Sequence, residues 1–181
     1  MIMLTLVSFT DIFGQATGDY QKTTDFSKYK SIFFAGWQKD SGEKINEFDR
    51  DRILAAFKSE FEERGIMFVD SSQADAALTI YIIAQKKTST TAYTDYVGGY
   101  GYRGAWGYGG MGMGTATTNY VDTEYIQGTM IVDVYDETNK DLLWQGILRD
   151  EVSENPKKRA KRLPKNIAKL MKQYPVDKVK D

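Results

Sequence analysis

The segment at residues 130–148 reads MIVDVYDETNKDLLWQGIL and decides the fold. Apolar and other residues alternate towards the end of residues 120–135, which predicts a strand. The polar run DETNK at residues 136–140 predicts a turn, and residues 142–152 predict a returning strand. One face of the returning strand is expected to carry three apolar residues, Leu142, Trp144 and Leu148. Together the two strands form a predicted hairpin.

Outside this hairpin the pattern predicts three further strands and two helices. The strands are expected at residues 29–37, 66–69 and 76–90, and the helices at residues 46–64 and from Pro164 to about Tyr174. In the first helix Ile53, Phe57 and Phe61 recur at helical spacing, and Gly65 is placed to cap the C-terminus. The order β-α-β-β-(Gly-rich insertion)-β-β-α predicts an α+β fold, with a mainly antiparallel sheet and two helices packed on one face.

A Gly/Tyr-rich tract interrupts the predicted sheet. Residues 98–114 hold nine of the chain's 16 glycines, and glycine loses more backbone entropy on ordering than any other residue. We therefore predict a flexible insertion at residues 92–118 of a single domain at residues 17–181. Its aromatic and basic side chains either stack on a partner or anchor the tract to its own domain, and the partner-binding candidates are Tyr100, Tyr102, Arg103, Trp106 and Tyr108. No helix follows the G-x-G-x-x-G matches in the tract, so they do not indicate a nucleotide site.

The composition excludes several kinds of chemistry. The sequence contains no His and no Cys, which removes the Ser-His-Asp and Cys-His relays, thiolate metal sites and disulfides. The acidic residues between Asp133 and Asp141 do not follow the spacing of an EF-hand calcium loop, and a polar turn explains them. We predict no cofactor, no metal site and no catalytic residues. The net charge of −1 does not favour a nucleic-acid partner.

The N-terminus resembles a secretory signal. Residues 1–9 read MIMLTLVSF, and Gly14 and Ala16 place small residues at the −3 and −1 positions of a cleavage site. The basic residue expected before the apolar run is missing, and a buried first strand or an N-terminal arm is the alternative. We predict a signal segment at residues 1–16. No other run approaches the length of a membrane span, so we expect no transmembrane segment.

A basic segment lies near the C-terminus. Residues 157–172 carry eight Lys or Arg and no acidic residue. Such a segment can bind anionic head groups, which would give peripheral membrane association, or nucleic acid. We interpret it instead as a solvated helix face balanced by the acidic helix at residues 46–64. The basic surface candidates are Lys157, Lys158, Arg159, Lys161 and Arg162.

Short segments spaced along residues 19–175 also form a recognisable set. They are Asp19-Tyr20, Phe26-Ser27-Lys28-Tyr29, Phe61-Glu62-Glu63-Arg64-Gly65, Ala74-Asp75, Gly128-Thr129 before the strand to Asp133, Thr138-Asn139-Lys140 before Leu142-Leu143-Trp144-Gln145-Gly146, and Tyr174-Pro175. In order and spacing this set resembles domain of unknown function 4136, a family of bacterial envelope proteins that are mostly predicted lipoproteins. The resemblance implies export and brings no established activity. We expect no lipid anchor on this sequence, which has no Cys to carry one.

Two functions are compatible with these features. The first is an exported, non-catalytic protein of the periplasm or outer envelope that binds an unidentified protein or envelope component. The alternative is a hydrolase that acts on envelope glycans without His or Cys, through carboxylate, Tyr or Lys chemistry. Carboxylate pairs such as Glu60 with Glu63, or Asp49 with Asp51, lie on a predicted surface helix and indicate no acid–base site.

We predict that the native mature chain begins near Thr17 and is found outside the cytoplasm, because residues 1–16 follow the signal pattern. Mass spectrometry of the N-terminus, on protein recovered from fractionated bacterial cells, measures this. An intact Met1 on cytosolic protein would contradict the prediction.

Overall fold

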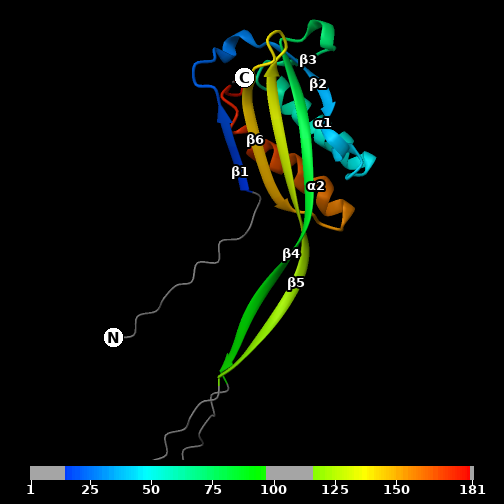
Figure 1. Cartoon of the computed structure of the whole chain (residues 1–181), viewed down its shortest axis with the longest axis vertical. Coiled ribbons are helices and arrows are strands. Elements are labelled where there is room, and N and C mark those ends of the chain that lie inside the picture. The colour runs from blue at the N-terminus through cyan, green and yellow to red at the C-terminus, as the bar shows by residue number, and fades with distance from the viewer. Residues whose placement is uncertain (1–14, 97–115, 180–181) are drawn as a thin grey trace, which may run out of the picture. The chain divides into compact units, whose positions relative to one another are not determined.

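The computed structural model describes residues 15–96 and 116–179. Contacts divide the chain into two compact units, residues 86–125 and the remainder. A six-stranded sheet has the order β1-β6-β5-β4-β2-β3, and α1 and α2 lie against the same face of it (Figure 1). The predicted α+β class is confirmed. None of the helices in the described ranges is long and apolar enough to cross a membrane.

The hairpin of β5 (Ala116–Asp136) and β6 (Leu142–Glu151) is antiparallel, as predicted. Asp136 organises its turn, because its Oδ1 accepts hydrogen bonds from the backbone N–H of Thr138 and Asn139. The register shifts between Val134, which pairs with Trp144, and Tyr135, which pairs with Leu142.

Because of that shift, the predicted apolar face of β6 is wrong at Leu142. The bulge leaves Leu142 on the surface, with 43% of it exposed, while Leu143 and Trp144 are buried. A one-residue shift moves a side chain to the other face of a sheet, so strict alternation counted from Leu148 fails at this end of the strand.

The sheet is mixed, because parallel pairing joins the strands at one side of it. β2 (Ser31–Trp37) pairs in parallel with β3 (Met67–Phe68) and with β4 (Ala76–Tyr96). Parallel neighbours need a crossover connection, and α1 supplies it between β2 and β3. The strands themselves were predicted close to these positions, but their pairing was not.

β1 (Gln15–Tyr20) is an additional strand that the sequence pattern missed. It pairs antiparallel with β6, from Gln15 opposite Arg149 to Tyr20 opposite Trp144. The strand contains Gly18 and has mostly exposed side chains, so it lacks the apolar alternation that reveals a strand. Its first two residues belong to the predicted signal segment, and residues 1–14 lie outside the described residues.

Helix α1 (Glu47–Glu62) agrees closely with the prediction. The Asn46 side chain caps it by accepting from the Asp49 N–H at 2.9 Å. Beyond its end, Gly65 has a φ of +74°, a conformation that favours glycine. Ile53 and Phe57 face the core, as their spacing indicated.

Helix α2 (Pro156–Met171) begins earlier than predicted. Asn155 caps it and Pro156 occupies its first turn, so Pro164 lies inside the helix instead of starting it. A proline in a helix interior removes one backbone hydrogen bond. Packing of Ile167 and Leu170 against the core, where both are fully buried, offsets that loss.

Trp144 lies at the centre of the core. It is fully buried, its Nε1 donates to the Gln173 carbonyl at 3.1 Å, and its ring meets Tyr174 edge to face with centroids 5.3 Å apart. Any side chain at Gly146 would collide with the indole ring, so the close approach requires glycine there.

A buried ion pair fixes the C-terminal segment to the helices. Arg64 Nη1 lies 2.7 Å from Glu60 Oε2. The same guanidinium donates to the carbonyls of Met171, at 2.8 Å, and Val176, at 2.9 Å. Lys178 adds a second cation on Glu60, at 3.1 Å.

The unit at residues 86–125 contains the outer parts of β4 and β5. Between them, Thr90 Oγ1 donates to Asp122 Oδ1 at 2.6 Å. β4 continues to Tyr96 and β5 begins at Ala116, so both strands include residues of the predicted insertion at 92–118. Residues 97–115 lie outside the described residues.

We predict that Trp144→Ala lowers the free energy of unfolding by roughly 3–5 kcal/mol, the range for truncating a large aromatic residue in a core. Leu142→Ala on the same strand is the matched control, and we expect a loss under about 0.5 kcal/mol because Leu142 is exposed. Urea unfolding followed by circular dichroism measures both. Similar losses for the two variants would contradict the assigned faces of β6.

Candidate functional site

An apolar cavity of about 120 Å³ opens between α1, α2 and the strands β4, β5 and β6. Ile53 comes from α1, Leu163 from α2, and Ile82 from β4. Met130 of β5 and Leu148 of β6 complete the floor. All five are apolar side chains, so the interior can hold an apolar group about the size of benzene.

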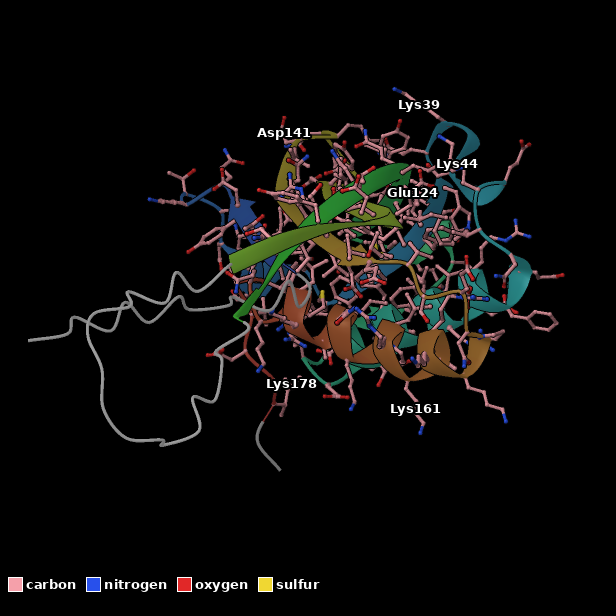
Figure 2. All side chains as sticks on the ribbon, turned by 90° about the horizontal axis from the view of Figure 1, so that it is seen from below. Lys39, Lys44, Glu124, Asp141, Lys161 and Lys178 are labelled. Atoms are coloured by element: carbon pink, nitrogen blue, oxygen red, sulfur yellow. The ribbon has the colours of Figure 1, made fainter. Side chains whose placement is uncertain are left out.

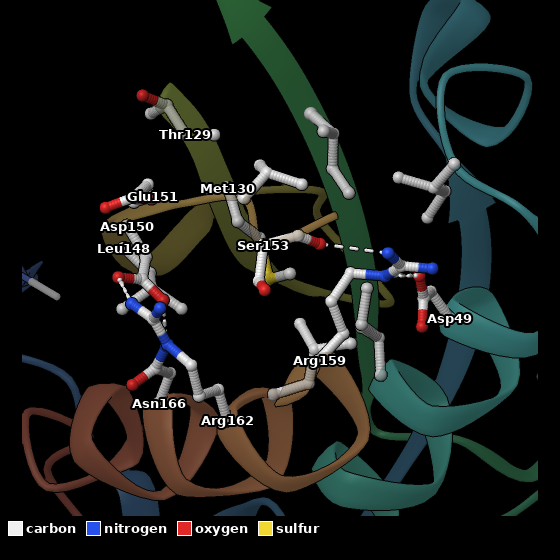
Figure 3. Close-up of a pocket in the computed structure, with 16 residues that line it drawn as sticks. Asp49, Thr129, Met130, Leu148, Asp150, Glu151, Ser153, Arg159, Arg162 and Asn166 are labelled. Carbon is white, nitrogen blue, oxygen red and sulfur yellow. Dashed lines mark hydrogen bonds and ion pairs between the residues drawn. The ribbon is translucent and has the colours of Figure 1, made fainter. Parts of the chain in front are cut away.

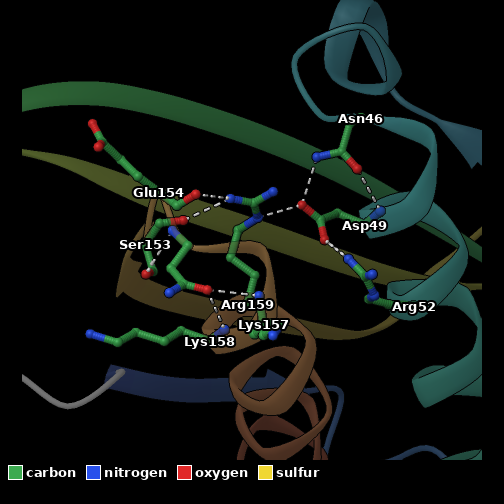
Figure 4. Close-up of polar contacts among 9 residues, drawn as sticks. Asn46, Asp49, Arg52, Ser153, Glu154, Lys157, Lys158 and Arg159 are labelled. Atoms are coloured by element: carbon green, nitrogen blue, oxygen red, sulfur yellow. Dashed lines mark hydrogen bonds and ion pairs between the residues drawn. The ribbon is translucent and has the colours of Figure 1, made fainter.

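Asp49, in the first turn of α1, forms one side of the cavity with the basic residues around it (Figure 4). Its side chain is 7% exposed, and its Oδ1 lies 2.5 Å from Arg52 Nη1. Its Oδ2 lies 2.7 Å from Arg159 Nε and accepts a 2.7 Å hydrogen bond from Asn46 Nδ2. Both carboxylate oxygens are therefore occupied by contacts within the fold.

Arg159 connects three elements at this side. Besides its contact with Asp49 on α1, its Nη1 donates to the carbonyls of Ser153 and Glu154, both at 2.9 Å. These carbonyls belong to the connection between β6 and α2, whose cap is Asn155. One guanidinium thus holds the start of α2 against the start of α1.

A second ion pair borders the opposite side of the cavity (Figure 3). Arg162 Nη2 lies 2.5 Å from Asp150 Oδ1, and Asn166 Nδ2 donates to Asp150 Oδ2 at 2.5 Å. Arg162 and Asn166 lie one helical turn apart on α2 and meet Asp150 at the end of β6.

The surroundings of Asp49 set its charge state. Burial alone would raise the pKa of its carboxyl group, but the hydrogen bonds from Asn46, Arg159 and Arg52 outweigh burial and lower the pKa below its usual range. Asp49 is therefore ionised at neutral pH and carries no proton to transfer.

The structure divides the basic segment into two groups. Arg159 and Arg162 form ion pairs and line the cavity, so interpreting the whole segment as a solvated face is incorrect for these two residues. The other three candidates, Lys157, Lys158 and Lys161, are exposed on α2, as that interpretation expected.

The five partner-binding candidates in the Gly/Tyr-rich tract lie outside the described residues. They are Tyr100, Tyr102, Arg103, Trp106 and Tyr108. Their role in binding a partner stays a prediction.

Acidic residues elsewhere have contacts within the fold. Asp136 accepts from turn amides and from Tyr29 Oη at 2.7 Å, and Asp133 accepts from Gln145 Nε2 at 2.8 Å. Across the described ranges, no group of three or more acidic residues is arranged to hold a metal ion. The expected surface placement of Asp49 and Glu60 is wrong, because both are buried in ion pairs.

Sequence reasoning missed the cavity and most of its residues. One signal was present, because Arg159, Arg162 and Asn166 follow the i, i+3, i+7 spacing of one helix face. That spacing was not interpretable while α2 was expected to begin at Pro164. The partners Asp49 and Asp150 come from distant segments and give no local signal.

We predict that Asp49→Asn lowers the free energy of unfolding at pH 7 by roughly 1.5–3 kcal/mol, the scale of hydrogen bonds to a charged group. Folding lowers the pKa of Asp49, so its ionised carboxylate stabilises the protein fully above the unfolded pKa of about 4. This stabilisation is lost as the pH falls through the folded pKa. The difference in unfolding free energy between wild type and Asp49→Asn should therefore shrink as the pH falls from about 5 to about 2, a range that includes the unfolded pKa of about 4.

Urea unfolding at a series of pH values measures this difference. Asp51→Asn is the matched control, since Asp51 is exposed on the same helix, and its effect should stay under about 0.5 kcal/mol at every pH. A loss for Asp49→Asn that did not change with pH would contradict an ionised Asp49 in the folded state.

Comparison with known proteins gives a family but no activity. A search of curated protein sequences returned no match. A crystal structure of a PDZ domain protein from Parabacteroides distasonis is similar to this chain at 13% identity and a TM-score of 0.53. The similarity covers 92% of this chain and 37% of that protein, so this chain spans little more than a third of its length.

The PelC dodecamer from Paraburkholderia phytofirmans also aligns, at 10% identity and a TM-score of 0.47, over 92% of this chain and 100% of PelC. The family model described as "Domain of unknown function (DUF4136)" matches residues 16–176, nearly the whole chain, and confirms the resemblance seen in the sequence. This chain belongs to the DUF4136 family of domains of unknown function.

Proposed function

We propose that this chain is an exported, non-catalytic binding protein of the bacterial envelope, and that the cavity between α1, α2 and the sheet is its binding site. One observation carries the proposal. The cavity has an apolar floor, while Asp49 and Asp150 at its border are tied in ion pairs to Arg159 and Arg162. Apolar cavities with a few fixed polar groups are typical of small-molecule sites.

The same ion pairs support a role without catalysis. Acid–base chemistry needs a group that exchanges a proton near the working pH. Asp49 has a lowered pKa, and the sequence contains no His or Cys to replace it. The ion pairs at this border position the two helices around the cavity, and a binding site needs such a fixed cavity.

Export and envelope association rest on the sequence. The apolar run at residues 1–9 and the small residues Gly14 and Ala16 support a signal segment. Membership of the DUF4136 family supports the same location, because the sequence resemblance to this family implies an envelope protein. The proposed location is the periplasm or the outer envelope.

We predict that benzene, used as a neutral apolar probe, enters the cavity. Titration should shift the methyl resonances of Ile53, Ile82 and Leu148 in ¹H–¹³C spectra to a saturating limit. Leu163→Trp should abolish the shifts, because Leu163 lines the cavity from α2 and a larger ring fills that space. The control is Leu54→Trp, a partly buried leucine on α1 that does not line the cavity.

Two results would overturn the proposed site. The first is the absence of saturable shifts in the wild-type protein. The second is unchanged benzene binding in a folded Leu163→Trp variant. Shifts that persist in Leu54→Trp and vanish in Leu163→Trp support the site.

A further inference from the structure

At the border of the cavity, the hydrogen-bond acceptors of two carboxylates are engaged, while some hydrogen-bond donors are not. Asp49 accepts through both oxygens, from Arg52, Arg159 and Asn46. Asp150 also accepts through both, and its donors are given above. Each of these four carboxylate oxygens already has at least one charged or amide donor.

The guanidinium groups still have unused donors. An Arg side chain has five N–H donors. Within residues 15–96 and 116–179, Arg162 donates only through Nη2, to Asp150, and its Nε and Nη1 have no partner. The Arg162 side chain lines the cavity and is 35% exposed. The border therefore offers donors to a ligand, while the acceptors of Asp49 and Asp150 are engaged.

Glu151 is the third carboxylate among the residues that line the cavity. Successive side chains in a strand point to opposite faces, so Asp150 faces α2 and Glu151 faces away from it. Figure 3 shows the Glu151 carboxylate directed away from the centre of the cavity. The residue is exposed at the end of β6.

We propose that the cavity binds a small amphipathic monocarboxylate, with its apolar group on the apolar floor and its carboxylate accepting from the N–H groups that Arg162 does not use for Asp150. This inference rests on the proposed binding function of the cavity. A guanidinium N–H forms a strong, charge-assisted hydrogen bond with a carboxylate, and Nε and Nη1 are the nitrogens that Arg162 does not use for Asp150. The neighbouring Asp150 favours a monoanion over a doubly charged phosphate, because repulsion grows with ligand charge.

The size of the cavity limits the apolar group. A volume of about 120 Å³ fits a short alkyl chain or one aromatic ring. A long lipid acyl chain would not fit inside this cavity. The inferred ligand class is therefore a short-chain or aryl carboxylate rather than a membrane lipid.

Hexanoate, 1-hexanol and hexylammonium test the head group, because they share one alkyl chain. In the wild-type protein at pH 7 we expect hexanoate to bind about tenfold more tightly than 1-hexanol, as a charge-assisted pair adds roughly that factor. Hexylammonium should bind no more tightly than 1-hexanol. Dissociation constants follow from the methyl shifts of Ile53 and Leu148.

Arg162→Gln should remove the preference for hexanoate over 1-hexanol. Lys161→Gln is the matched control, since it removes the same charge from α2. Lys161 does not line the cavity, and in Figure 2 it points away from the protein. The control should keep the preference for hexanoate.

The outcomes separate this inference from the proposed function. Equal wild-type affinities for hexanoate and 1-hexanol overturn the carboxylate inference alone, provided that benzene still binds. A preference that survives in Arg162→Gln overturns the role of Arg162. If none of the probes binds, the proposed site itself is wrong. The wild-type comparison decides the inference even if Arg162→Gln does not fold.

Discussion

The packing of Trp144 is the constraint on which the rest of the core depends. Its indole ring occupies the space above Gly146, meets Tyr174 edge to face, and donates to the Gln173 carbonyl. These contacts join β6 to the segment that follows α2. Because the ring is fully buried and its one polar atom is satisfied, this side chain fixes where α2 ends against the sheet.

Ion pairs then hold the two helices at a fixed separation. Arg159 and Asp49 join their first turns, and Arg64 joins the end of α1 to the Met171 carbonyl at the end of α2. Closing the helices onto the floor between them would displace charges that are already paired, at a large desolvation cost. The proposed binding site is thus a consequence of how the helices are anchored, and Asp49 and Asp150 take part in that anchoring.

Much of the fold was predictable because its signals are local. The turn at residues 136–140, the apolar stripe of α1 and the cap at Gly65 are set by residues within a few positions of one another. Pairing between strands was not predictable in the same way. β1 gives no alternating apolar pattern, and the parallel pairing of β2 with β4 depends on the path of the chain through α1.

The sequence by itself determined the α+β class, the hairpin, the burial of Trp144 and the absence of His and Cys chemistry. Only the tertiary structure decided that Pro164 lies inside a helix and that two arginines of the basic segment border a cavity. Periodicity and capping act over one or two turns of chain, and sequence reports them directly. Arg159 meets Asp49 across 110 positions, and such a contact exists only once the sheet and both helices are packed.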